Sequence, residues 1–192
     1  MSVTTGQLQK IRRSGVWGRN IASCLIAFAL VEVTFMCLLV ARGGVPGQVI
    51  SLGPYQFPST ALEPWSGRVY VASMLATFSA LAIASLYLIR AVFSDLALGN
   101  IFCGANVRRI RNLGWVAIAI GIFYLLLPLT KTAYFMLASQ ADIAFRDETT
   151  LFVGLGQIVS GGLYILLSWI MAVGLGVRED AEELRRDAEL VI

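Results

Sequence analysis

The chain has 192 residues, of which 57% are apolar and 14% are charged, and its mean hydropathy is +0.75. This composition excludes an ordinary soluble domain, because so few charged residues cannot cover a water-exposed surface. The formal net charge is +3, and the absence of histidine excludes a histidine general base, a histidine-ligated zinc and a haem axial histidine.

Residues 1–19 form a basic segment. It carries Lys10, Arg12, Arg13 and Arg19 and no acidic residue. We expect it to become helical before the first span and to lie on an anionic membrane surface. Binding of a partner protein is an alternative that its charges leave open.

Four apolar runs follow, and each can cross a hydrocarbon core of about 30 Å, which takes about 20 residues. They are Asn20–Ala41, Val69–Phe93, Leu113–Leu137 and Val153–Val177. The first run is longer than the apolar core of a signal peptide and lacks a small-residue cleavage site, which favours a retained span. The sequence therefore predicts an all-α membrane protein: four transmembrane helices in residues 20–177 and a charged tail in residues 178–192.

Positive charges are distributed unevenly between the two sides that this layout creates. Eleven of the fifteen Lys and Arg residues lie in or beside the N-terminal segment, the second loop and the tail. Because positive residues in short loops remain in the cytoplasm, both termini and the second loop are predicted to be cytoplasmic.

Several local patterns accompany the spans. Glycine and proline interrupt the first loop, and residues 48–52 and 55–57 are predicted to form a short hairpin. Alanines at every fourth position from 72 to 84 predict a helix-packing face, against this chain or another copy. Pro128 is expected to kink or end the third helix, and the glycines of the fourth span indicate close packing. A long side chain at Lys131 is expected to reach the membrane interface.

Glu32 is the acidic residue nearest the middle of a span. A lone carboxylate there costs on the order of several kcal/mol, so such residues are functional candidates. Two interpretations remain open: a hydrogen bond within the chain or to a partner, and coupling to a proton or cation. The sequence offers no second ionisable residue at the middle of a span to relay a proton.

Between the second and third spans, the segment Leu96–Trp115 predicts a turn and then a helix that starts near Cys103. Asn106, three residues into this helix, is placed to hydrogen-bond the turn before it. Three basic side chains give the helix start a positive surface, namely Arg108, Arg109 and Arg111.

The pattern Gly99-x-x-Phe102-x-x-x-Asn106-x-x-Arg109-Ile110-Arg111-x-x-Gly114-Trp115 resembles a signature of an uncharacterised bacterial integral-membrane family, domain of unknown function 2975. The four-span layout and the tail ending Asp187-Ala188-Glu189-Leu190-Val191-Ile192 resemble that family too. Cys103 departs from its usual Ser or Thr, a natural N-cap, and Val191 replaces a common Thr. The resemblance implies a multi-pass protein of the bacterial cell (inner) membrane and implies no activity. In size and gene setting, such proteins resemble membrane partners of small helix-turn-helix repressors.

The tail, residues 178–192, carries six acidic and three basic residues. Glu182 lies four residues before Arg186, a favourable helical pair. We expect a tail helix that docks on the basic second loop through Glu182, Glu183, Asp187 or Glu189, with Leu190–Ile192 covering Ile101 or Phe102. A solvated charged tail is the alternative.

The sequence contains no motif for catalysis, phosphate binding, a metal or a cofactor, and no catalytic residue is predicted. We therefore expect a non-enzymatic integral membrane protein, a binding or regulatory module for a cytoplasmic regulator protein, with no direct contact to nucleic acid. The candidate partner-binding residues are Phe102, Asn106, Arg108, Arg109, Arg111, Glu182, Glu183 and Asp187. The alternative is a small transporter, channel or immunity-type protein that uses Glu32, as a homo-oligomer because four spans are few.

Overall fold

The computed structural model describes residues 5–43, 49–52, 55–58, 64–99, 103–137 and 148–190. The elements in chain order are α1 (Thr5–Ala41), β1 (Val49–Leu52), β2 (Tyr55–Pro58), α2 (Trp65–Ala97), α3 (Gly104–Leu137) and α4 (Glu148–Leu190). All four helices are long and apolar enough to cross a membrane, and each contains one predicted span. The strands pair antiparallel, from Val49 opposite Pro58 to Leu52 opposite Tyr55, which confirms the predicted hairpin.

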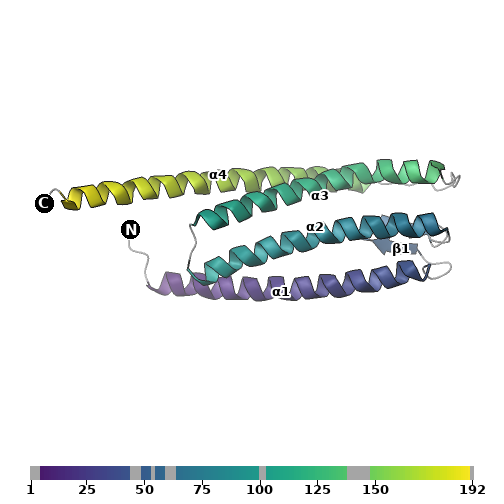
Figure 1. The fold of residues 1–192 in the computed structure, drawn as a ribbon, viewed down its shortest axis with the longest axis horizontal. Helices are drawn as coiled ribbons and strands as arrows, with labels where there is room; N and C mark the ends of the chain where they lie inside the picture. Colours follow the sequence, from purple (N-terminus) through teal and green to yellow (C-terminus); the bar gives the residue numbers. More distant parts are fainter. Residues whose placement is uncertain are drawn as a thin grey trace.

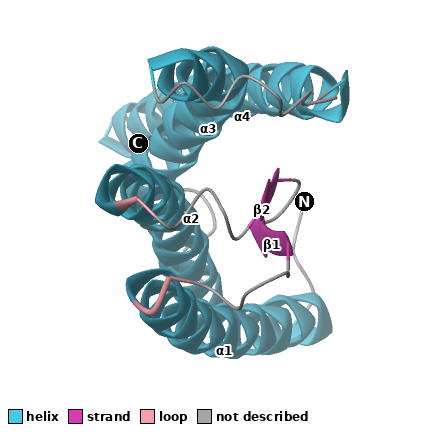
Figure 2. Cartoon of the chain, turned by 90° about the vertical axis from the view of Figure 1, so that its right-hand side faces the viewer, coloured by secondary structure: helices cyan, strands magenta, loops and turns pink. Residues whose placement is uncertain are grey.

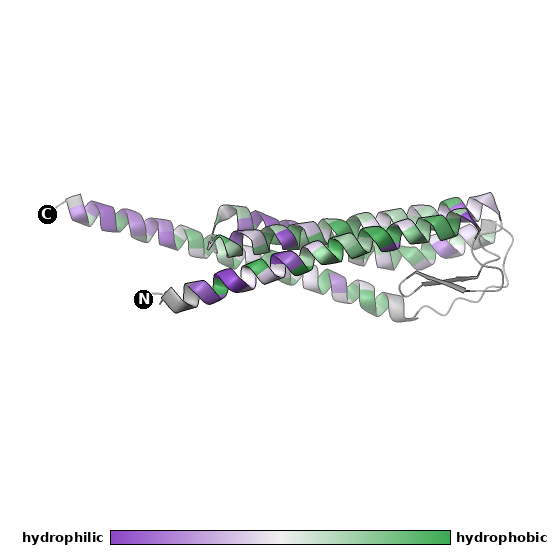
Figure 3. Cartoon of the chain, turned by 90° about the horizontal axis from the view of Figure 1, so that it is seen from below, coloured by the Kyte–Doolittle hydropathy of each residue, from purple (hydrophilic) through white to green (hydrophobic). Residues whose placement is uncertain are grey.

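Two of the helices are much longer than a membrane span. At 1.5 Å per residue, the 37 residues of α1 extend about 55 Å and the 43 residues of α4 about 65 Å. Their excess turns are the charged ones and project from the same end of the molecule (Figures 1 and 3). We call this end, formed by residues 5–19, 94–99, 103–111 and 178–190, the charged end; the opposite end is the hairpin end. Because α1 is one continuous helix, the basic segment prolongs the first span instead of turning along the membrane surface.

The helices form an open arc when viewed along their axes (Figure 2). Each helix packs against its neighbours in sequence, most extensively α3 against α4 and α1 against α2. The first and last helices make no comparable contact with each other, so the arc does not close into a bundle. Most apolar side chains of α1 and α4 therefore face outward, which is stable in lipid.

Glycine brings the backbones of α3 and α4 into direct contact. A Cβ atom added at Gly161 of α4 would lie 2.6 Å from the carbonyl oxygen of Gly114 on α3. One at Gly121 of α3 would lie 2.7 Å from the carbonyl oxygen of Gly154 on α4. The predicted close packing of the fourth span is confirmed at Gly154 and Gly161, whereas a Cβ added at Gly156, Gly162, Gly174 or Gly176 would meet nothing within 4 Å.

The second helix buries a different stripe from the predicted one. Its buried face towards the hairpin end consists of Gly67, Val71, Leu75 and Ser79. Ala76 and Ala80, one position further on, are exposed, whereas Ala72 and Ala84 are half-buried and Ala72 packs against the core around Val71. Only part of the alanine stripe therefore packs within this chain, and its packing against another copy stays a prediction. The larger side chains Val71 and Leu75 bury more apolar surface than alanine does, and they contribute more dispersion contacts to the interface.

The structure bears on two expectations about α3. The helix continues to Leu137, so Pro128 does not end it. Lys131 does not extend outward from the helix as a snorkelling side chain would, because it is 2% exposed and lies within the protein. The nearby core cluster consists of Val40, Val71, Tyr124 and Leu127.

Candidate functional site at the charged end

An ion pair joins α2 to α3 at the charged end. The guanidinium of Arg109, in the second turn of α3, binds the carboxylate of Asp95 near the end of α2. The two side chains are only 32% and 19% exposed. The same Nη1 atom donates to the amide oxygen of Asn106 at 3.3 Å and to the backbone oxygen of Ala91 at 3.4 Å. One arginine therefore connects the last turns of α2 to the first turns of α3.

Asn106 is the most deeply buried polar side chain of this corner, with 1% exposure. Its backbone N–H donates to the carbonyl oxygen of Cys103 at 3.0 Å, and its side-chain oxygen accepts from Arg109. Cys103 immediately precedes the helix, and its thiol lies 3.9 Å from Oδ2 of Asp95. This contact is weak, because a thiol is a poorer hydrogen-bonding group than the hydroxyl of a Ser or Thr cap.

The first helix reaches the same corner through Arg12. The Nε atom of Arg12 donates to the backbone oxygen of Ala97, the last residue of α2, at 3.3 Å. A cation is favourable there because the last carbonyls of a helix lack helical partners and form the negative end of its dipole. A Cβ added at Gly15 would lie 2.4 Å from the backbone nitrogen of Ala97. Glycine therefore allows the close approach that places Arg12 at the end of α2.

These contacts separate the predicted partner-binding residues of the second loop into two groups. Asn106 and Arg109 bind residues of their own chain and hold the corner together. Arg108 and Arg111 are exposed on the outer surface of α3. Phe102 lies outside the described residues. The sequence analysis treated the three arginines as one positive surface. The nearby acid Asp95 neutralises Arg109, so only Arg108 and Arg111 contribute to that surface.

Residues 54–192 match the model of a family described as Protein of unknown function (DUF2975). The chain belongs to DUF2975. The match includes the corner residues and the helices α2, α3 and α4, and it begins after α1. The resemblance drawn from the signature is therefore confirmed. No curated protein and no solved structure matches the chain.

The described residues of the tail of this DUF2975 protein form no ion pair with the described part of the second loop. Helix α4 continues past its apolar span and projects from the charged end (Figure 3). Its residues 177–189 are exposed. Its ion pairs are internal, since Arg178 binds Glu182 at 2.8 Å and Arg185 binds Glu189 at 3.2 Å. The predicted docking through Glu182, Glu183, Asp187 or Glu189 is therefore wrong, and so is the pairing of Glu182 with Arg186. The expected cover of Ile101 or Phe102 lies outside the described residues.

The other predicted tail residues of the DUF2975 protein lie on the same projecting helix. Glu183 and Asp187 are both exposed. Val191 and Ile192 fall outside the described residues. The observed tail matches the alternative expectation of a solvated charged helix.

Glu32 lies on the exposed surface of α1. Among the residues that the structure describes, no hydrogen bond or ion pair involves its carboxyl group. Two hydroxyls within the spans bond inside their own helices: Thr34 donates to the backbone oxygen of Leu30 and Ser85 to that of Leu81. The described ranges also contain no group of three His, Cys, Asp or Glu residues able to hold a metal ion.

A second polar cluster of the DUF2975 protein joins α2 and α3 at the hairpin end. The rings of Tyr70 and Tyr134 are stacked with centroids 4.6 Å apart. The hydroxyl of Tyr134 lies 3.0 Å from that of Ser66, and the hydroxyl of Tyr70 lies 3.3 Å from that of Thr130. These contacts fix the two helices to each other at the end opposite the ion pair.

Proposed function

We propose that this protein is a non-enzymatic membrane module that binds a soluble cytoplasmic protein through its charged end. The observation that carries the proposal is an exposed apolar stripe on the projecting tail helix. Val177, Ala181, Leu184 and Ala188 follow each other at intervals of four, three and four residues, and all are exposed. Val177 is 63% exposed and Leu184 is 70% exposed.

The spacing of this stripe is that of a helix that packs against another helix. The internal ion pairs hold the tail helical without covering the stripe. Leu184 lies beyond the apolar span, where exposure to water is unfavourable, so a partner that covers it gains burial free energy. The expected partner presents an amphipathic helix, and the exposed Arg108 and Arg111 add attraction for acidic groups on it.

The cytoplasmic location of this surface follows from the excess of positive residues on that side. Family membership and the four apolar helices support a multi-pass membrane protein. The corner built from Asp95, Asn106 and Arg109 supports the proposal indirectly, because it fixes the start of α3 from which Arg108 and Arg111 project.

The test is affinity purification of the tagged full-length protein from native membranes, followed by quantification of soluble proteins that accompany it stoichiometrically. Leu184→Asp is expected to weaken the complex about 30-fold or more, the effect of losing a central interface anchor. Leu98→Asp is the matched control, because Leu98 is 67% exposed at the same end but lies outside the stripe. The proposal is wrong if no soluble protein is retained stoichiometrically, or if both substitutions reduce retention equally.

A further inference from the structure

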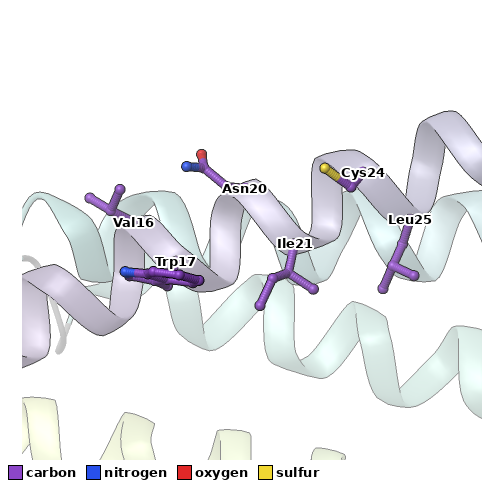
Figure 4. A pocket seen from close by; sticks show the side chains of 6 residues that line it. All are labelled: Val16, Trp17, Asn20, Ile21, Cys24 and Leu25. Carbon is purple, nitrogen blue, oxygen red and sulfur yellow. The ribbon is translucent and has the colours of Figure 1, made fainter.

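A groove lies at the charged end of α1, apart from the corner at Asp95 and from the apolar stripe of the tail. Its volume is about 380 Å³, and the groove is open to the outside. The lining residues all come from α1 and are Val16, Trp17, Asn20, Ile21, Cys24 and Leu25. They form two rows of side chains at four-residue spacing, with Trp17, Ile21 and Leu25 in one row and the other three beside them (Figure 4). The groove is mostly apolar and runs along the helix axis.

The length of the groove corresponds to one leaflet of a membrane. From Val16 to Leu25 the helix rises about 14 Å, which is close to half of a hydrocarbon core of about 30 Å. Trp17 stands at the outer end of the groove and is 64% exposed. An exposed tryptophan at this position is typical of the boundary between acyl chains and headgroups.

Two cations precede the groove on the same face. Arg13 lies one turn before Trp17, and Lys10 lies two turns before it, so both share the side of α1 that carries the Trp17 row. Both side chains are exposed, whereas Arg12 is turned to the backbone of Ala97. The sequence has no acidic residue before Glu32, so no carboxylate on these turns offsets the positive charge.

We propose that this face of α1 binds an anionic phospholipid, with one acyl chain in the groove and the headgroup phosphate at Lys10 and Arg13. The order along the helix matches the order of groups in such a lipid: charge, then interfacial region, then chain. A zwitterionic lipid also fits the groove but binds more weakly, because the positive charge of its headgroup reduces the attraction to Lys10 and Arg13. Each basic residue near an anionic surface strengthens binding about fivefold, so the two together give roughly a 30-fold preference.

The test uses contact quenching of Trp17 fluorescence in the full-length protein. The other three tryptophans are replaced by phenylalanine, and the protein is reconstituted in phosphatidylcholine vesicles with a minor fraction of brominated lipid. Brominated phosphatidylglycerol is expected to quench Trp17 at a roughly 30-fold lower mole fraction than brominated phosphatidylcholine. In Lys10→Gln/Arg13→Gln the preference should fall to near one, and in Lys10→Arg/Arg13→Lys it should persist.

The matched control is Arg185→Gln/Arg186→Gln, which removes two exposed cations from the same end of the molecule but from α4. This control is expected to retain the preference. Equal quenching by the two lipids, or a preference that survives Lys10→Gln/Arg13→Gln, would overturn the proposal. Protection of Trp17 from both brominated lipids would overturn it as well, because a protein surface would then cover the groove.

Discussion

Replacing Gly161 by alanine tests whether direct backbone contact holds α3 to α4. The added Cβ would lie 2.6 Å from the carbonyl oxygen of Gly114 and 2.6 Å from Cγ1 of Ile118. It would also lie 3.0 Å from the backbone nitrogen of Ile118. Ordinary contact begins at 3.4 Å, so α3 and α4 must separate by about 0.8 Å at this crossing. A rotamer change of Ile118 cannot relieve the strain, since two of the three contacts are with backbone atoms.

The neighbouring residue supplies the control. A Cβ added at Gly162 meets nothing within 4 Å, so Gly162→Ala changes helix propensity without changing packing. Alanine favours a helix over glycine by about 1 kcal/mol at either position. That gain is common to both variants, and the difference between them therefore isolates the cost of overpacking, which is about 1–3 kcal/mol.

The assay is unfolding of the purified protein in mixed micelles by increasing fractions of SDS, followed by the loss of helical circular dichroism. We expect Gly161→Ala to have a free energy of unfolding about 1–3 kcal/mol below that of Gly162→Ala. Gly154→Ala should fall between them, because its shortest contact is 3.1 Å. Equal unfolding midpoints for Gly161→Ala and Gly162→Ala would refute direct backbone contact between the helices.

Two further predictions concern the charged end. Asp95→Asn should lower the free energy of unfolding in the same SDS assay by about 1–2 kcal/mol, because it leaves the half-buried guanidinium of Arg109 without a counter-ion. The control is Arg178→Gln, which breaks an exposed ion pair and should lower the free energy of unfolding by less than about 0.5 kcal/mol. The second prediction concerns the orientation of the tail, and it uses Glu179→Cys in a chain whose three native cysteines are replaced by serine. Because the tail is predicted to be cytoplasmic, a membrane-impermeant maleimide should label this cysteine only after the cells are permeabilised. Labelling of Glu179→Cys before permeabilisation would contradict the predicted orientation.

The number of helices and the position of each span follow closely from the sequence. A hydrocarbon core requires about 20 apolar residues to satisfy the backbone within one segment, so each span is visible as a run of that length. The hairpin is visible for a related reason, because glycine and proline bound its two short strands. The sequence also shows the charged segments at both termini. It does not show that each one continues the helix of the neighbouring span.

The contacts between helices were much harder to predict. In water an apolar face indicates burial, but in lipid an exposed apolar face is equally stable, so hydropathy does not distinguish a packed face from a lipid-facing one. The alanines from 72 to 84 therefore predicted a packing face of which this chain buries only a part. A better signal was the seven-residue spacing of Gly114 with Gly121 and of Gly154 with Gly161, which places small residues at matching heights on two antiparallel helices.

At the candidate site, the residues were identified but part of their role was not. Arg109 binds Asp95 and the end of α2, and Asn106 accepts from Arg109, so both hold the corner of their own chain together. Contact of either with a partner stays a prediction. Asp95 and Arg109 lie fourteen residues apart and on different helices. Only the reversal of chain direction between α2 and α3 brings them together, and a pattern of local spacing does not contain that information.

The open arc explains why polar contacts are concentrated at the ends of α2 and α3. The chain consists of two helix pairs, α1 with α2 and α3 with α4, and the α2–α3 contact that joins them is the least extensive of the three. In lipid the hydrophobic effect does not favour helix–helix contact. The position of α2 along α3 therefore depends on directional polar interactions. Arg109 with Asp95 supplies them at the charged end, and the stacked Tyr70 and Tyr134 supply them at the hairpin end. A change at either end therefore alters the angle between the pairs, and with it the distance between the basic segment of α1 and the tail of α4.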